Sequence, residues 1–294
     1  MTEAPKFAIF PQEIINIIVE DVLKSIQILP KFQRKQATEN LSAVSHAFAG
    51  ATRQYLFRSL KFSGSGRTLT PDIPTFIELA ETSRQHRTLT PLNRLVRGLT
   101  LEVGANLAHF SSATANELSR LLHFLFQDQD TTVTDLTLRL QAEDPAMGHG
   151  KIDSWEDCLG RLRTEMKQVF ASPRLNRLSI HKFQGVPSNL FEGTRLRELA
   201  LYKATLSDDG HKEALQRSLR KLELTNASAP LVECLSDNFK GTFSSLKVLK
   251  TGRTPLPVVQ HLLETNDGSL QSLTLSVDQA YAGVQARKSF YHCH

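Results

Sequence analysis

Cysteine is scarce in this 294-residue chain, with only Cys158, Cys234 and Cys293 at widely separated positions. An odd number of cysteines without paired spacing excludes a zinc-finger pattern and does not fit a disulfide-stabilised secreted domain. The opening residues, MTEAPKFAIF, lack the basic and apolar segments of a secretory signal peptide. The sequence also contains no run of eighteen or more apolar residues, the length that a membrane-spanning helix needs. We therefore expect a cytoplasmic or nuclear protein without a membrane partner.

Motifs of catalytic sites are also absent from the sequence. There is no His-Glu-x-x-His motif and no Gly-x-Ser-x-Gly motif. The glycine-rich stretch FSGSGRTLTP, at 62–71, lacks the Lys-Ser/Thr ending of a phosphate-binding loop and fits a flexible linker better. The final residues His292, Cys293 and His294 offer three metal ligands without a fourth that would close the site. We expect a protein that is not an enzyme and that binds no cofactor and no metal.

The excess of positive charge is modest. Lysine and arginine number 35 against 30 acidic residues, which gives a net charge of +5 and a pI of about 9.1. The stretch SRQHRTLTPLNRLVRG carries four arginines without an acid: Arg84, Arg87, Arg94 and Arg97. No aromatic ladder accompanies them, so the charge favours a solvated or partner-facing surface over a nucleic-acid interface.

What the chain does contain is a repeated six-residue pattern. LRELAL at 196–201 and LRKLEL at 219–224 are two copies of the pattern apolar-x-x-Leu-x-apolar. Seven copies, the weaker one at Leu249 included, have their central leucines at Leu99, Leu136, Leu178, Leu199, Leu222, Leu249 and Leu273. The last four steps are 21, 23, 27 and 24 residues long, within the period of leucine-rich repeats, whereas the first two, of 37 and 42, leave room for extra structure.

Each copy predicts a short strand followed by a helix-like return. Apolar positions two residues apart face the same side of a strand, and neighbouring strands must stack to bury them. Ser207 and Asp208 can cap a segment running to Leu219, and Pro257 suits the first turn of a later one. Two longer sets recur at helical spacing: Leu118, Leu121, Leu122 and Leu125, and, after Ser154, Leu159, Leu162, Met166 and Val169. Alternating strands and helices predict an α/β fold, with parallel strands backed by helices.

A different, helical pattern precedes the repeats. A first apolar stripe follows Pro11 and consists of Phe10, Ile14, Ile17, Ile18 and Val22. A second stripe consists of Leu41, Val44 and Phe48. From the residues alone, these helices are interpreted as a small cap over the first strand of a solenoid.

The same residues resemble the F-box, a short helical module of SCF-type ubiquitin ligases. FPQEIINIIVEDVL resembles its opening segment, and LSAVSHAFAGATRQYLFRSLKF resembles its later helix as fungal members have it. Phe10 and Phe48 depart from the usual leucine and tryptophan, and the connection ILPKFQRKQATEN is longer than in the family. The resemblance implies docking onto the ligase's adaptor subunit through Pro11, Glu13, Ile14, Ile17, Leu41, Val44 and Phe48.

We therefore expect an F-box-like module at 7–62, a linker and helical connection at 63–92, a leucine-rich-repeat-like solenoid at 93–280 and a tail at 281–294. The resemblance implies a substrate-recognition subunit of an SCF-type ubiquitin ligase, which binds the adaptor and a target protein and is not itself catalytic. The alternative is a leucine-rich-repeat interaction scaffold whose N-terminal helices only cap the solenoid.

Residues that alternate with the buried leucines should line the concave face of the solenoid. They favour an acidic or phosphorylated target segment, and the candidate target-binding residues are Arg177, His181, Tyr202, Lys221 and Lys250. The residues after Leu275 have little amphipathic pattern, so we hypothesise that the last repeat is imperfectly capped.

Overall fold

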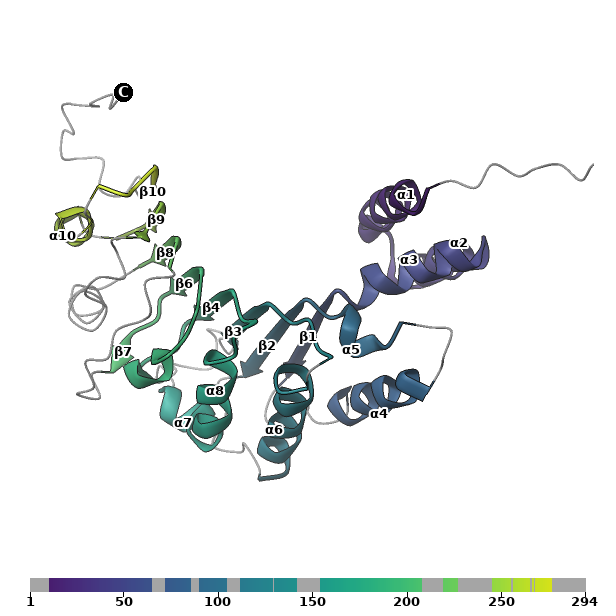
Figure 1. The fold of residues 1–294 in the computed structure, drawn as a ribbon, viewed down its shortest axis with the longest axis horizontal. Helices are drawn as coiled ribbons and strands as arrows, with labels where there is room; N and C mark the ends of the chain where they lie inside the picture. Colours follow the sequence, from purple (N-terminus) through teal and green to yellow (C-terminus); the bar gives the residue numbers. More distant parts are fainter. Residues whose placement is uncertain are drawn as a thin grey trace, which may run out of the picture.

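The computed structural model describes residues 11–64, 72–85, 90–104, 112–128, 130–141, 154–207, 219–226, 245–254, 256–264, 266 and 268–276. Over these residues the chain forms a helical module followed by a long parallel sheet with helices along one face, as Figure 1 shows. The α/β fold class predicted from the repeated pattern is confirmed.

The main sheet of the described residues has eight strands, all parallel, and their spatial order follows the chain. They are β1 (Ser59–Gly64), β2 (Gly98–Gly104), β3 (Asp135–Gln141), β4 (Arg177–His181), β6 (Glu198–Tyr202), β8 (Lys221–Thr225), β9 (Val248–Gly252) and β10 (Ser272–Ser276). A second, two-stranded pair joins β5 (Val186–Pro187) to β7 (Leu206–Ser207). The predicted boundary at residue 62 falls inside β1, a strand whose copy of the repeated pattern, Phe57, Leu60 and Phe62, had been assigned to the helical module.

The register of the sheet follows the repeated pattern. The central leucines predicted from the sequence pair with one another in one continuous row from Leu99 on β2 to Leu273 on β10. Because the side-chain period of a strand is two, this register places every second side chain of all these strands on the same face.

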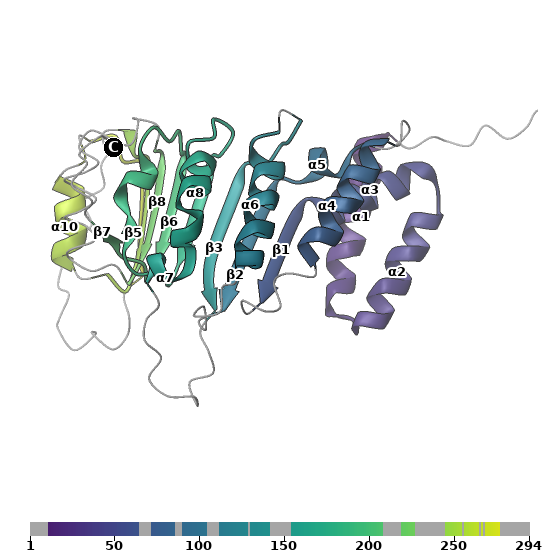
Figure 2. The same ribbon diagram turned by 90° about the horizontal axis from the view of Figure 1, so that it is seen from below.

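Helices cover that face of the sheet. They are α4 (Asp72–Gln85), α5 (Leu92–Leu95), α6 (Ser112–Phe126), α7 (Trp155–Leu159), α8 (Arg163–Phe170) and α10 (Leu256–Glu264), with 3₁₀ turns η4 (Gly160–Leu162) and η5 (Ser188–Phe191). Figure 2 shows α4, α6, α7 and α8 in front of the strands. The helices predicted around Leu118 and after Pro257 are confirmed as α6 and α10. The helix expected after Ser154 is divided into α7 and α8 by η4, and the segment expected between Asp208 and Leu219 lies outside the described residues.

The core lies between the sheet and this helical layer. Leu118, Leu121, Leu122 and Leu125 of α6 are all fully buried, as are the central leucines of the inner strands. Trp155 packs edge-on against Phe170 and Phe183, with ring centroids 6.5 and 5.5 Å apart. Each such buried side chain contributes about 1.5–3 kcal/mol of hydrophobic stabilisation, so this continuous core dominates the stability of the chain.

The same backbone conformation recurs where four strands end. Lys182, Lys203, Asn226 and Arg253 follow β4, β6, β8 and β9, and all four have φ between 50° and 66°. Their backbone N–H groups donate to the last residue of the next strand, as Lys203 does to the carbonyl of Thr225 at 2.8 Å. A left-handed conformation is costly for residues other than glycine, so its recurrence marks a turn that the neighbouring strand holds in place.

The N-terminal module consists of α1 (Gln12–Ser25), the 3₁₀ turn η1 (Ile26–Ile28), α2 (Lys31–Ala43) and α3 (His46–Phe57). The first predicted helix is confirmed as α1. Ile15, Val19 and Leu23 are buried against Ala51 of α3, whereas Ile14, Ile17 and Ile18 are exposed. Both triplets have helical spacing, so periodicity alone could not decide which of them faces the interior.

The second predicted stripe spans a break between helices. The helix α2 ends at Ala43, Val44 is its C-cap, and Ser45 begins α3 by accepting a hydrogen bond from the Phe48 N–H through its hydroxyl at 3.3 Å. Leu41 and Phe48 pack against the module's core, while Val44 is exposed. Serine at this position is a strong helix start, which explains why the stripe could not continue as one helix.

Candidate interaction surfaces

The face of the sheet opposite the helices is open and concave in Figure 1. Its side chains form rows across the strands, because the pairing is parallel and in register. One row runs through Asp135, Arg177, Glu198 and Lys221. A row four residues further along contains Glu102, Arg139, His181 and Tyr202.

Two of the three cations predicted to bind a target are paired within this face. The Glu198 carboxylate lies 3.2 Å from the Lys221 ammonium and 3.8 Å from the Arg177 guanidinium. Lys250 is exposed and forms no ion pair with a described residue. Of the predicted cationic stripe, Lys250 alone therefore lacks a carboxylate partner among the described residues.

His181 and Tyr202, the other predicted target-binding residues, form a stacked pair. Their rings lie 4.3 Å apart at an interplanar angle of 17°. Burial lowers the pKa of His181 to about 4, and Arg139 and Lys182 add to the shift. Burial and a hydrogen bond with Glu223 raise the pKa of Tyr202 to about 12. At neutral pH the pair is thus an uncharged, flat aromatic platform on the concave face.

Glu102 forms an ionic cluster at the other end of the face that sequence reasoning missed. Its carboxylate accepts from the Lys61 ammonium at 2.8 Å, the Arg139 guanidinium at 3.1 Å and the Ser63 hydroxyl at 3.0 Å. The hydrogen bond from Lys61 contributes most to lowering the pKa of Glu102, and Ser63 and Arg139 lower this pKa further. The sequence signal for this cluster is that Glu102 and Arg139 occupy the same register position on neighbouring strands. Adding Lys61 to the cluster requires that β1 be recognised as a strand.

The helical module carries an exposed apolar surface. Of the predicted adaptor-binding residues, Ile14, Ile17 and Val44 are 42%, 56% and 63% exposed, and Pro11 and Glu13 are exposed as well. The same module also exposes Ile18, Ile28, Phe32 and Leu56. Leu41 and Phe48 instead hold the module together from inside. The module thus leaves several large apolar side chains exposed to solvent.

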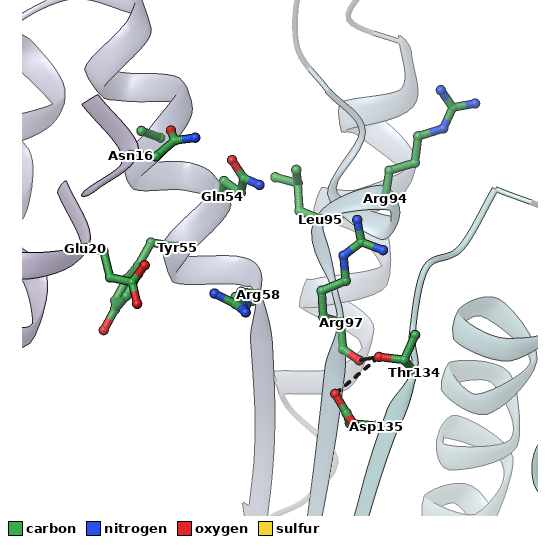
Figure 3. Close-up of a pocket in the computed structure, with 11 residues that line it drawn as sticks. Asn16, Glu20, Gln54, Tyr55, Arg58, Arg94, Leu95, Arg97, Thr134 and Asp135 are labelled. Atoms are coloured by element: carbon green, nitrogen blue, oxygen red, sulfur yellow. Dashed lines mark hydrogen bonds between the residues drawn. The ribbon is translucent and has the colours of Figure 1, made fainter. Parts of the chain in front are cut away.

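A polar hollow of about 540 Å³ lies where the module meets the sheet. Figure 3 shows Glu20 and Tyr55 on the wall from the module and Arg94 and Arg97 on the wall opposite. A second hollow, of about 510 Å³, shares Arg94 and Arg97 with the first. Arginines and carboxylates line both hollows, and the described residues hold no group of three possible metal ligands.

No helix among the described residues combines the length and the apolar character needed to cross a bilayer. A scan of the sequence against protein-family models finds no matching model, and a search of curated proteins finds no matching protein. The interaction surfaces are therefore the basis on which a function is proposed.

Proposed function

We propose that the protein is a non-catalytic substrate-recognition subunit of an SCF-type ubiquitin ligase. In this proposal α1 to α3 form an F-box that docks on the adaptor, and the curved sheet is a leucine-rich-repeat solenoid that holds a target. The observation that carries the proposal is the exposure of Ile14, Ile17 and Val44 on a module whose own core is complete without them.

The repeat interpretation is supported by conformation as well as by register. The pattern leucines pair from strand to strand, and the left-handed residues Lys182, Lys203, Asn226 and Arg253 recur at the strand ends. A unit that repeats its buried positions and its turn conformation behaves as one turn of a solenoid.

The mechanism would be proximity. The module grips the adaptor while the sheet holds the target, and the direct passage from α3 into β1 fixes the distance between the two surfaces. Such a connection raises the effective concentration of target lysines near the charged ubiquitin enzyme without any catalytic residue in this chain.

The test is capture of purified adaptor subunit by the full chain and by an Ile14→Asp, Val44→Asp variant. Both side chains are exposed, so the variant should fold while losing the apolar contact. A Leu79→Asp, Leu273→Asp variant is the matched control, because these leucines are 49% and 41% exposed outside the module. We expect capture by the native chain and the control only.

Failure of the folded native chain to capture the adaptor would contradict the proposal. The exposed residues of the module would then belong to an interaction scaffold whose helices cap the sheet. Capture that survives in the Ile14→Asp, Val44→Asp variant would show that the adaptor binds elsewhere.

A further inference from the structure

The residue that precedes each strand occupies an equivalent place in every repeat. Its backbone carbonyl accepts two N–H groups from the start of the next strand: the carbonyl of Arg197, for example, accepts from Arg220 at 2.8 Å and from Lys221 at 3.0 Å. The same pair of hydrogen bonds to one carbonyl recurs at every strand boundary of the main sheet, from Arg58 to Lys247. We call the eight residues at this place the entry rim: Arg58, Arg97, Thr134, Asn176, Arg197, Arg220, Lys247 and Gln271.

Five of the eight entry-rim residues are cations. All five are exposed, and none forms an ion pair with a carboxylate in the part of the chain that the structure describes: Arg58, Arg97, Arg197, Arg220 and Lys247. This distinguishes them from Arg177 and Lys221 on the concave face, which share Glu198. Among the described residues, all five rim cations are thus unpaired, whereas Lys250 is the one predicted concave-face cation without a carboxylate partner.

The spacing of these cations is set by the sheet. Parallel strands lie about 4.8 Å apart, so the row from β1 to β9 spans about 29 Å. Arg197, Arg220 and Lys247 stand on three adjacent strands, and Arg58 and Arg97 stand on two. At its first end the row opens onto the hollow of Figure 3, whose Arg94 is paired with Asp130 at 2.6 Å.

We propose that the entry rim is a docking surface for an extended acidic segment of a partner protein. A chain of about nine extended residues has the length of the row, and carboxylates along it would meet successive cations. The row is one residue wide, and Asp135 and Glu198 follow it directly on the strands. These carboxylates would repel a second line of phosphates, and no entry-rim residue is aromatic, so the surface suits a narrow polypeptide better than a nucleic acid. Adaptor binding is not required for this interaction.

The probe is a fluorescein-labelled peptide of about ten glutamates, which is about 33 Å long when extended. Its binding to the full chain is followed by fluorescence anisotropy at low salt. The test variant is Arg197→Gln, Arg220→Gln, Lys247→Gln, which leaves the backbone bonds of the rim in place. The matched control, Lys31→Gln, Lys182→Gln, Lys203→Gln, removes the same charge from exposed lysines outside the entry rim. Thermal unfolding by circular dichroism checks that both variants keep the fold.

We expect the rim variant to bind the peptide about tenfold more weakly and the control to bind within about twofold of the native chain. Binding should also fall steeply as salt rises from about 0.05 to about 0.5 M. An equal loss in both variants would overturn the proposal, since binding would then follow net charge alone. Absence of peptide binding, or tighter rim-dependent binding of an oligothymidylate of equal charge, would overturn it as well.

Discussion

The helical module and the sheet region use the same kinds of apolar residue in opposite ways. In the sheet region nearly every patterned leucine is buried in one continuous core, whereas the module buries a small set centred on Val19 and leaves Ile14, Ile17 and Val44 in solvent. The two regions are joined directly, because α3 runs into β1. In the sheet region apolar residues stabilise the fold, and in the module a large share of them remains available to a partner.

The largest expected effect comes from opening the aromatic core of the sheet region. Phe183→Ala removes a fully buried ring from Trp155, so we expect a loss of about 3–5 kcal/mol in the free energy of unfolding. Trp155 is the single tryptophan, so its fluorescence in urea reports on this core. Ile17→Ala, on the exposed surface of the module, should change the value by less than about 0.5 kcal/mol. Similar losses in both variants would erase the distinction between the regions.

A second comparison lies within one row of the sheet. Leu222 is fully buried, whereas Leu273, two strands along in the same row, is 41% exposed. We expect Leu222→Ala to cost about 2–5 kcal/mol and Leu273→Ala less than about 1 kcal/mol, measured by urea denaturation. A large cost at Leu273, or strong amide protection there, would contradict an imperfectly capped last strand.

The independence of the module can be tested from its own core. Val19→Asp places a charge where a fully buried side chain packs against α3, and should cost the module about 3 kcal/mol. We expect amide protection to fall across α1 to α3 in hydrogen exchange, while the urea midpoint reported by Trp155 stays unchanged. A matching shift of that midpoint would mean that module and sheet unfold as one unit.

The smallest expected effect concerns pH. His181 binds a proton near pH 4 in the folded chain and near its ordinary pKa of 6.5 when unfolded, because burial, aided by Arg139 and Lys182, opposes the charged form. The unfolded state therefore binds more protons between pH 6.5 and about 4, and stability falls as pH falls through this window. His181→Phe keeps the stacking on Tyr202 and should remove on the order of 1 kcal/mol of that dependence, since the ring is partly exposed. An unchanged slope of stability against pH would exclude this role.

The sequence predicted the repeating part of the fold well. Leu99, Leu136, Leu178 and their successors recur at fixed offsets, and burial of such residues requires adjacent parallel strands. It missed β1, although Phe57, Leu60 and Phe62 fit the same pattern, because this stretch was assigned to the F-box-like module. It also left the inner face of α1 undecided, because isoleucines occur on both sides of that helix and only packing against Ala51 selects Ile15.

The candidate surfaces were harder to predict than the strands. Outward positions such as Arg177 and Lys221 followed from alternation, but their pairing with Glu198 depends on the register across three strands. The entry rim was hidden for a related reason. Arg197 and Arg220 occupy the same position in the two copies LRELAL and LRKLEL. Only the folded sheet aligns them with Arg58 and Arg97.

The doubly accepting carbonyls of the entry rim have a mechanical consequence. Each one ties a strand to its immediate successor alone, so a pull on the chain beyond β10 would load one strand boundary at a time. The strands would then detach one after another, in a series of small force steps rather than in one rupture. The strand β10, which among the described residues pairs only with β9, would detach first, and the boundary between β1 and β2, beside the module, would open last.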